Sequence, residues 1–512
     1  MLIGHFLHYP ARRFPDRLAV IGEDRRLTFA EADAEANQFA HALRAAGIAK
    51  GDNIAVMLPN VADYAVVNFG TARSGAVLAH LSYRYAAKDL IYALDKIGAE
   101  LLVHHADYND LVDAIESDLP RLKSRIVVGG TPAGGHSLAD FISGQPVTPP
   151  AVDIAETDPF AITFTGGTTG LPKAVVVSHK SRIASAMPIV AQHGLTEADR
   201  AAIVTPLFHT AGLFVWFHSV IWHGCTCSLL PTWDPAAFIA LVERDRITAV
   251  FMVPTQLNGL VRHPDFDPAR LATLRNVGFG GAPMPHALIT ELQRLLPAAR
   301  FTENYGQSEI CPMTMKTHED FTDHPDTIGR AAFNIEVDVF GPDGKPLAPG
   351  EVGEIVTRGD QLLLEYYDDP EQTRALYRTG DGWLWTGDLG SRDEAGYFAL
   401  VDRSKDMIIS GGENIYPKEI EDVLFGHEAV SECAVFGIPD DHWGEVAAAH
   451  VVLKPDAALT ADELIEFSVQ YLARYKRPRL IEFVDEIAKT PVGKVQKHQI
   501  RAPYWKDRAK KI

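Results

Sequence analysis

Two near-continuous apolar runs, at residues 247–253 and 274–279, constrain the fold of this chain more than any other feature. Such runs are typical of parallel strands, because helices cover both faces of a parallel sheet. A helix is also expected near the N-terminus, where Thr28 and Glu31 have the spacing of a capping box and Gly47 can end the helix. Helix–strand alternation continues to about residue 340, which predicts an α/β fold with large, parallel-rich sheets.

The pattern changes twice in the rest of the chain. Short strands separated by Pro-Asp-Gly and Pro-Gly turns predict a small β-barrel-like subdomain at about residues 335–402. A compact α+β pattern then follows to residue 512, with helices after Pro417 and Thr460 and strands at 433–438, 446–453 and 480–484. Because 512 residues are too many for one hydrophobic core, we expect an N-terminal domain of residues 1–402 and a C-terminal domain of residues 403–512.

A loop of small and hydroxylated residues lies between two β-type segments. It runs from Thr165 to Gly170, closes on Pro172 and Lys173, and is followed by the apolar run 174–177. Glycines let the backbone approach an anion, threonine hydroxyls add donors, and a lysine adds positive charge, so the loop suits a triphosphate. It is not a Walker A motif, because Gly-Lys-Ser/Thr does not occur in the sequence. A polar hairpin loop is the alternative, although few hairpins need so many hydroxyls and a lysine.

This loop resembles the phosphate-binding loop of the adenylate-forming superfamily, which includes acyl-CoA synthetases, firefly luciferase and the adenylation domains of peptide synthetases. Four further segments resemble motifs of that superfamily, in the same order. They are 303–309 (adenine and magnesium), 386–388 (ribose), 402–406 with 411–417 (hinge and following loop) and 491–495 (catalytic lysine). The resemblance spans nearly the whole chain, is strongest to bacterial acyl-CoA or aryl-CoA ligases, and implies a mobile C-terminal domain.

The resemblance implies ATP and coenzyme A as ligands, with Mg²⁺. Tyr305 would stack on adenine, Asp388 would accept the ribose hydroxyls, and Arg403 would reach the ribose or the α-phosphate. The full set implied to bind ATP or coenzyme A is Thr165, Gly166, Gly167, Thr168, Thr169, Gly170, Gly281, Ala282, Pro283, Glu303, Asn304, Tyr305, Gly306, Gln307, Ser308, Asp388, Leu400, Arg403, Ser410, Gly411, Gly412 and Glu413. Taken alone, Asp388 also fits a turn aspartate and Arg403 a surface arginine.

Four residues are implied to act in the chemistry: Lys494, Glu309, Lys173 and His209. Lys494 would bridge the carboxylate and the α-phosphate during adenylation, and the small domain would withdraw it afterwards. Glu309 would bind Mg²⁺, with Thr168 as a second metal candidate. His209 would gate the acyl pocket, although a core histidine is the alternative. Lys405 holds the hinge position of the superfamily, where a plain surface lysine is the other interpretation.

The acyl pocket is expected to be apolar and uncharged. Its implied lining is Phe208, Ala211, Gly212, Phe251, Gly280, Cys311 and Pro312. These segments contain no aspartate for a substrate ammonium and no basic residue for a second carboxylate. We therefore expect an uncharged medium-chain or aromatic acid. Two positions depart from the usual motif, Gly166 and Ala174, but neither change removes a charged group.

Composition excludes several other classes of protein. The net charge of −19 argues against nucleic acid or an anionic membrane as the main partner. The N-terminus has neither a basic segment nor a long apolar one, so we expect a cytoplasmic protein without an integral membrane segment. The most apolar stretch, 211–230, predicts a buried helix and a core strand. It contains Cys225 and Cys227, whose spacing favours core cysteines over a zinc site.

Three functions compete on the sequence alone. An ATP-dependent acyl-CoA synthetase is favoured by the motifs, with a small carboxylic acid, ATP and coenzyme A as partners. An acyl-AMP ligase that loads a carrier protein is the second, and a nucleotide-binding regulator without catalysis is the third. The charged residues Lys173, Glu309, Asp388, Arg403 and Lys494 are all present, which argues against the regulator. The sequence leaves the oligomeric state open, with a homodimer as one alternative.

Overall fold

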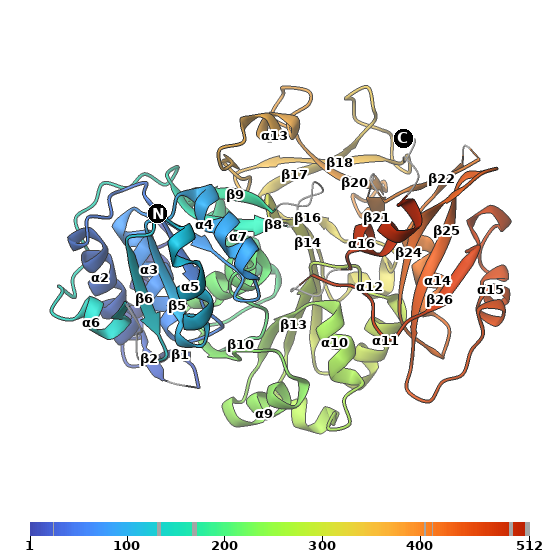
Figure 1. The fold of residues 1–512 in the computed structure, drawn as a ribbon. Coiled ribbons are helices and arrows are strands. Elements are labelled where there is room, and N and C mark those ends of the chain that lie inside the picture. The colour runs from blue at the N-terminus through green and yellow to red at the C-terminus, as the bar shows by residue number, and fades with distance from the viewer. Residues whose placement is uncertain are drawn as a thin grey trace.

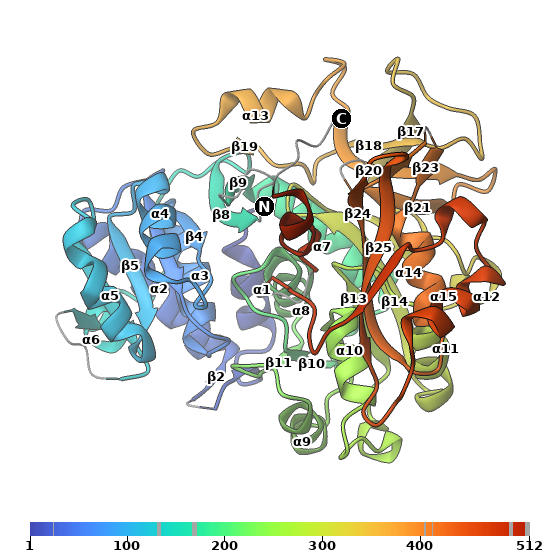
Figure 2. The same ribbon diagram turned by 45° about the vertical axis from the view of Figure 1, so that its right-hand side comes forward.

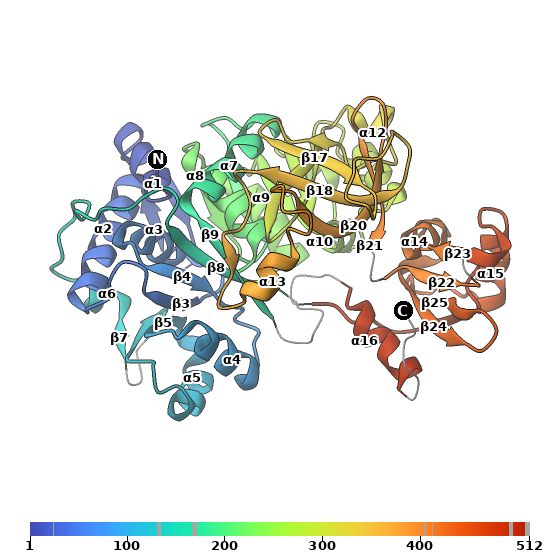
Figure 3. The same cartoon turned by 90° about the horizontal axis from the view of Figure 1, so that it is seen from above.

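The computed structural model describes residues 1–23, 25–130, 135–165, 172–403, 406–411, 413–490 and 495–506, with the side chain of Arg403 excepted. In this part of the chain the strands form four sheets, of nine, eight, four and five strands. The two larger sheets and their helices make up the large N-terminal domain, and the C-terminal elements form a separate, smaller group (Figures 1 and 3).

The eight-stranded sheet carries the phosphate-loop region and has the strand order β19-β9-β8-β4-β3-β5-β6-β7. Its strands are β3 (Asn53–Met57), β4 (Val77–His80), β5 (Leu101–His105), β6 (Ser124–Val128), β7 (His136–Ser137), β8 (Pro159–Thr165), β9 (Lys173–Ser178) and β19 (Glu365–Tyr366). Six of them run parallel, whereas β9 is antiparallel to both β8 and β19. The carboxyl ends of β4 and β8 therefore lie at the same edge of the sheet.

The nine-stranded sheet has the order β16-β15-β14-β13-β12-β10-β11-β1-β2. Its strands are β1 (Leu18–Ile21), β2 (Arg26–Thr28), β10 (Arg200–Ile203), β11 (Thr226–Leu229), β12 (Ala249–Met252), β13 (Asn276–Gly280), β14 (Arg300–Gln307), β15 (Ile310–Lys316) and β16 (Arg330–Ala331). The strands from β1 to β14 in this order are parallel, and the edges are antiparallel. The two apolar runs at 247–253 and 274–279 contain β12 and most of β13, so their prediction as covered parallel strands is confirmed.

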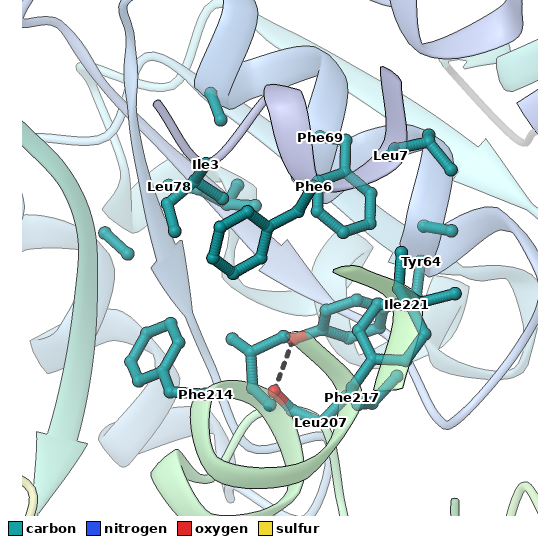
Figure 4. Close-up of a cluster of buried hydrophobic side chains, with 14 of the residues drawn as sticks. Ile3, Phe6, Leu7, Tyr64, Phe69, Leu78, Leu207, Phe214, Phe217 and Ile221 are labelled. Atoms are coloured by element: carbon teal, nitrogen blue, oxygen red, sulfur yellow. Dashed lines mark hydrogen bonds between the residues drawn. The ribbon is translucent and has the colours of Figure 1, made fainter. Parts of the chain in front are cut away.

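Helices form layers on and between these two sheets. Apolar side chains of α9 (Pro235–Asp245), α10 (Pro254–Val261) and α11 (His286–Leu295) pack on one face of the nine-stranded sheet. Those of α4 (Ala87–Ile97) and α5 (Asn109–Ile115) cover the outer face of the eight-stranded sheet. The largest core cluster lies between the sheets and includes residues of α1 (His5–Arg13), α2 (Phe29–Ala45), α3 (Asp63–Ser74), α6 (Leu138–Ile142), α7 (His179–Gln192), α8 (His218–Trp222) and the π-helix η3 (Ala211–Phe217) (Figures 2 and 4).

The remaining elements complete the large domain and form the small one. The expected β-barrel-like subdomain is an antiparallel sheet in the order β17 (Ile335–Phe340), β18 (Gly353–Gly359), β20 (Leu384–Arg392) and β21 (Phe398–Arg403). Short helices α12 (Asp320–Asp323) and α13 (Pro370–Ala375) flank it. The small domain contains β22 (Ile408–Ser410), β23 (Glu413–Ile415), β24 (Val430–Asp440), β25 (Gly444–Leu453), β26 (Leu480–Phe483), α14 (Pro417–Phe425), α15 (Ala461–Val469) and α16 (Lys497–Arg501).

Several local predictions are confirmed by this fold. The N-cap Thr28 of α2 makes a capping box with Glu31, and Gly47 has a positive φ of 85°. The stretch 211–230 forms η3, α8 and β11, whose residues are all buried except the half-buried Trp222. Cys225 and Cys227 are buried free thiols, as expected of core cysteines.

Within the residues that the structure describes, no helix has both the length and the apolar character needed to cross a membrane.

Candidate functional site

A cavity of about 570 Å³ lies between the large domain and the small domain. The large domain contributes residues of α10, α11 and β14, and the small domain contributes residues of α14 and β24. Its wall is mixed: Leu288, Ile289 and Phe321 are apolar, whereas Glu303 and Lys418 are charged. A partly apolar cavity with convergent polar groups, placed at a domain interface, has the properties of a small-molecule site.

Many of the residues implied to bind ATP line this cavity. They follow the carboxyl end of β13 or lie on β14, β20 or β21, and they are Gly281, Ala282, Pro283, Glu303, Asn304, Tyr305, Gly306, Asp388 and Leu400. The structure therefore brings together the adenine and ribose motifs, although they are separated along the chain. Residues 166–170, Lys405, Gly412 and Lys494 lie outside the described residues.

Asp388 is held in place by hydrogen bonds to two residues of the adenine motif. Its Oδ2 accepts a hydrogen bond from the Tyr305 hydroxyl at 2.6 Å and another from Gln307 Nε2 at 2.8 Å. Gln307 Nε2 also donates to the Thr386 carbonyl at 2.9 Å. In the β20–β21 ladder, Asp388 pairs with Arg403. The carboxylate is thus positioned as a fixed acceptor at the cavity wall, as recognition of a ribose hydroxyl requires.

Glu303, another residue that lines the cavity, has an altered acidity. Burial raises its pKa to about 7, and the positive charges of Lys316 and Lys418 counteract this rise. Lys316 Nζ donates to the carbonyls of Pro325 at 2.6 Å and Thr327 at 2.9 Å. Sequence reasoning missed Lys316 and Lys418, because neither belongs to a motif and each reaches the cavity only through the tertiary fold.

Glu309 lies in a separate polar cluster beside the strands that flank the phosphate loop. Its Oε1 accepts a hydrogen bond from the Tyr366 hydroxyl at 2.7 Å, and its backbone carbonyl accepts one from Leu363 N at 2.7 Å. Lys173 Nζ lies 4.7 Å from the centre of the Tyr366 ring. Burial and the neighbouring Glu309 carboxylate raise the pKa of Tyr366, so its hydroxyl stays protonated as a donor. Sequence reasoning missed Tyr366.

The cluster around Glu309 fits a hard divalent cation. A carboxylate is a preferred ligand of Mg²⁺, and Tyr366 orients the Glu309 carboxylate through one of its two oxygens. For Oε2 of Glu309 no hydrogen-bond partner is found among the described residues. The second metal candidate, Thr168, lies outside them. The Glu309 carboxylate would therefore hold Mg²⁺, and the ion would supply charge neutralisation to the phosphates.

The residues expected to line the acyl pocket are packed together, but they do not line the large cavity in the described part of the chain. Ala211, Phe251 and Cys311 share the core cluster between the two large sheets. Phe208 meets Tyr83 edge-on, with ring centroids 5.3 Å apart. Two of these residues are glycines at which the backbone approaches another backbone segment closely. A Cβ added to Gly212 would lie 2.5 Å from Pro206 O, and one added to Gly280 would lie 2.1 Å from Asn304 O. His209 Nδ1 accepts a hydrogen bond from Ala211 N at 3.3 Å. Pro312 lies on β15, which is buried.

The expectation that no basic residue adjoins this pocket is wrong in one respect. Arg182 on α7 is fully buried, and its Nη1 donates to Cys311 Sγ at 3.2 Å. Its other partners are also uncharged: Nη2 donates to Gln361 O at 2.5 Å and Nε to Ser181 Oγ at 3.4 Å. Burial lowers the pKa of Arg182. The sequence did not reveal this contact, because an arginine in a helix is normally exposed.

The small-domain loop implied to approach coenzyme A contains one tightly packed glycine. Gly411 has a positive φ of 59°, and a Cβ added to it would lie 2.6 Å from Trp443 Cε3. Gly411 N donates to Trp443 O at 2.8 Å. Ser410 is buried and Glu413 is exposed. The loop backbone therefore lies flat against an exposed aromatic ring, where only glycine fits.

Comparison with known proteins places this geometry in a family. Residues 7–367 match the family described as AMP-binding enzyme, and residues 419–494 match the AMP-binding enzyme C-terminal domain. A feruloyl-CoA synthase from an Amycolatopsis species is 36% identical over 493 residues, covering 96% of both chains. The long-chain-fatty-acid–CoA ligase FadD13 of Mycobacterium tuberculosis is 36% identical over 510 residues, covering 98% of both.

The fold agrees with the sequence comparison. The solved structure of the anthranilate CoA ligase AuaEII in complex with anthranoyl-AMP superposes with a TM-score of 0.92 at 27% identity, covering 98% of this chain and 97% of that chain. Both the motifs around the cavity and the full-length matches lead to the same result. The chain belongs to the AMP-binding enzyme family, within the adenylate-forming superfamily that its motifs resemble.

Proposed function

We propose that this AMP-binding enzyme is an acyl-CoA synthetase, which activates a carboxylic acid with ATP as acyl-AMP and transfers the acyl group to coenzyme A. One observation carries the proposal. The interdomain cavity is lined both by Tyr305 and Asp388 of the nucleotide motifs and by Lys489, just before the catalytic-lysine motif, and Val495, its last residue. A site that joins these motifs suits acyl-AMP formation, and the AMP-binding enzyme matches cover residues 7–367 and 419–494.

The chemistry explains why two domains are needed. A carboxylate is a poor acyl donor, because its charge repels nucleophiles and oxide is a bad leaving group. Joining it to AMP creates a mixed anhydride that a thiol can attack. The enzyme must first hold two anions together and stabilise charge on the departing pyrophosphate, and must then admit a thiol. Positioning and electrostatics carry most of such a reaction.

In the first step, the residues of the nucleotide motifs hold ATP. Tyr305 stacks on adenine, Asp388 accepts the ribose hydroxyls, and Lys173 with the loop from Thr165 to Gly170 binds the β- and γ-phosphates. The fixed Asp388 carboxylate and the position of Lys173 beside Tyr366 support these roles. Mg²⁺, when bound by Glu309, supplies charge neutralisation at the phosphate oxygens.

Lys494 acts in the first step and not in the second. Its ammonium follows the negative charge that develops as pyrophosphate leaves. The small domain carries it, so a rotation about a hinge at Lys405 can remove it once the adenylate has formed. We infer that the domain boundary lies between Asp402 and Arg403, at the end of β21, whose last residue is Arg403.

The acceptor is coenzyme A, and a carrier protein or a purely regulatory role is not favoured. The names of the relatives described above, a feruloyl-CoA synthase, a long-chain-fatty-acid–CoA ligase and an anthranilate CoA ligase, each combine a carboxylic acid with coenzyme A. The acid is an uncharged medium-chain or aromatic acid, because Phe208, Phe251 and Ala211 are buried and apolar. The free cysteines suit a reducing compartment, so we propose the cytoplasm as its location.

Pyrophosphate release from a panel of acids, with and without coenzyme A, tests this proposal. Hexanoate and benzoate should give acyl-AMP with pyrophosphate release, and acyl-CoA should form only when coenzyme A is added. Malonate and amino acids should be poor substrates, because an unpaired buried charge is costly. A preference for malonate would instead identify Arg182 as the partner of a second carboxylate and overturn the uncharged-acid proposal. Absence of pyrophosphate release with every acid would favour the regulator.

The Gly411 backbone offers a prediction about the thioester step. Gly411→Ala should slow acyl transfer to coenzyme A by about 10-fold or more while sparing adenylation, because the new Cβ would displace Trp443 and the loop. Acyl-AMP should then accumulate on the enzyme. Gly444→Ala is the matched control: Gly444 also has a positive φ and pairs with Ser410, but its nearest neighbour would lie 3.7 Å away. Equal effects of the two variants would remove Gly411 from the thioester step.

A further inference from the structure

Four buried histidines have a ring nitrogen without a hydrogen-bond partner among the described residues: His80, His104, His193 and His218. A buried polar atom without a partner is unfavourable, and each such atom in a folded protein needs an explanation. One of these atoms, His80 Nε2, lies beside the segments expected to hold the acid. The surroundings of His80 also define what kind of group would satisfy it.

The hydrogen bonds around Tyr64 establish that His80 Nε2 is an acceptor. The Tyr64 hydroxyl donates its one proton to the Leu207 carbonyl at 2.9 Å (Figure 4), so its oxygen must accept from His80 Nδ1–H at 2.7 Å. Burial lowers the pKa of His80 to about 3, so the ring is neutral and carries only that proton. Nε2 therefore presents a lone pair, and the group that would satisfy it must be a hydrogen-bond donor.

The position of His80 points to the substrate. It is the last residue of β4 and pairs in parallel register with Thr163 of β8, so both side chains lie on the same face of the sheet. Thr163 Oγ1 is 3.5 Å from Oγ1 of Thr210, which directly precedes the acyl-pocket residues on η3. Thr165, the first residue of the phosphate loop, follows two residues after Thr163, about 7 Å along the same face. Ligands of α/β proteins bind at this end of parallel strands.

The other three histidines lack this setting. His218 is surrounded by the rings of Phe6, Phe69, Phe160, Phe214 and Phe217. His193 Nε2 lies 3.0 Å from Nδ2 of Asn304, a residue of the adenine motif. His104 is the penultimate residue of β5, two strands from β4, and its Nδ1 lies 3.1 Å from the His105 carbonyl. Among these four histidines, only His80 pairs in the sheet with a residue of β8, the strand that enters the phosphate loop.

We propose that His80, with Thr163 and Thr210, forms a subsite for a hydroxyl group on the distal part of the acid, so that the preferred substrates are hydroxylated aromatic acids. A phenolic hydroxyl donates to His80 Nε2 and accepts from a threonine hydroxyl. The ring of Phe214 lies edge-on to His80 at 6.0 Å and supplies an apolar wall. This inference rests on the acyl-CoA synthetase activity proposed above and narrows its substrate class.

The hydrogen-bonding requirement of His80 Nε2 also distinguishes a hydroxylated acid from unsubstituted acids and from dicarboxylic acids. An unsubstituted ring or an alkyl chain would leave Nε2 without a partner, and a second carboxylate offers no proton to a neutral imidazole. A hydroxyl is thus the smallest addition to the acid that satisfies the site. A permanently buried water molecule, held by His80 and the two threonines, is the other possible occupant, and the experiment below distinguishes it.

Acids that differ by one hydroxyl group test the proposal. For benzoate against 3- and 4-hydroxybenzoate, and cinnamate against 3- and 4-hydroxycinnamate, kcat/KM should favour a hydroxylated member by about 10-fold or more. His80→Met removes the acceptor and should abolish this preference, with the unsubstituted acid of each pair as the internal reference. His80→Gln keeps a side-chain acceptor and should retain part of it. His104→Met is the matched control, since it removes a buried histidine with the same unpartnered atom from the same sheet.

Each outcome is decisive. If wild-type enzyme shows no preference for any hydroxylated acid, or if His80→Met leaves the preference unchanged, the subsite does not exist. If His80→Met lowers kcat/KM equally for both members of a pair, the atom holds a structural water, and the proposal is also overturned. If His104→Met abolishes the preference as His80→Met does, the effect is structural. Formation of no acyl-CoA from any acid would instead overturn the proposed enzyme activity.

Discussion

Lys494→Ala is expected to slow acyl-AMP formation by about 10² or more and to change the thioester step far less. The reason is that Lys494 would stabilise charge that develops only as pyrophosphate leaves, and removal of such a group lowers kcat for that step alone. Adenylation is measured as pyrophosphate release in a single turnover. The second step is measured by supplying synthetic acyl-AMP and coenzyme A. Equal losses in both half-reactions would show that the lysine is structural.

Lys489 provides the matched control for this variant. It lies on the same segment, lines the cavity, and forms an ion pair with Glu432 at 2.5 Å. A partly exposed pair of this kind contributes little to stability. Lys489→Ala should therefore leave adenylation within a few-fold of the wild-type rate, according to the small energies of exposed ion pairs. A loss as large as that of Lys494→Ala would mean that the positive charge of the whole segment, rather than one ammonium, drives the first step.

The elements that the sequence predicts well are those set by local patterns. The Thr28–Glu31 capping box, the strands within 247–253 and 274–279, and the helix after Pro417 depend on neighbours a few residues apart. The nucleotide residues were predictable for another reason. Tyr305 and Asp388 belong to motifs that can be found in the sequence by their order and spacing. In the fold, the Tyr305 hydroxyl lies 2.6 Å from Asp388 Oδ2.

The residues that could not be predicted take their roles from distant partners. Tyr366 lies 57 residues from Glu309, and Arg182 lies 129 residues from Cys311. No periodicity or turn chemistry relates such positions, since only the packing of α7, β15 and β19 brings them together. The role of His80 Nε2 was equally unpredictable, because Nε2 is an acceptor only through the tautomer that the hydrogen bond with Tyr64 imposes on the ring. Tertiary contacts thus determine how the motif residues are supported.

Glu309→Gln is expected to lower kcat/KM for MgATP by about 10² or more and to weaken the dependence of nucleotide binding on Mg²⁺. The substitution removes the negative charge that a hard cation requires, while the amide oxygen can still accept the hydrogen bond from Tyr366. Binding of ATP by calorimetry at several Mg²⁺ concentrations separates the metal effect from the chemistry. An unchanged Mg²⁺ dependence would exclude Glu309 as the ligand.

Tyr366→Phe completes this test, because it removes the hydroxyl that orients the Glu309 carboxylate and leaves the charge in place. Loss of a group that orients a metal ligand costs about 10- to 100-fold in affinity or activity. We expect the lower end of that range, because the backbone bond from Leu363 N still fixes the Glu309 main chain. The double variant should lose little more than Glu309→Gln alone, since the two residues act through one contact. Additive losses would show that Tyr366 acts on the nucleotide independently, through its contact with Lys173.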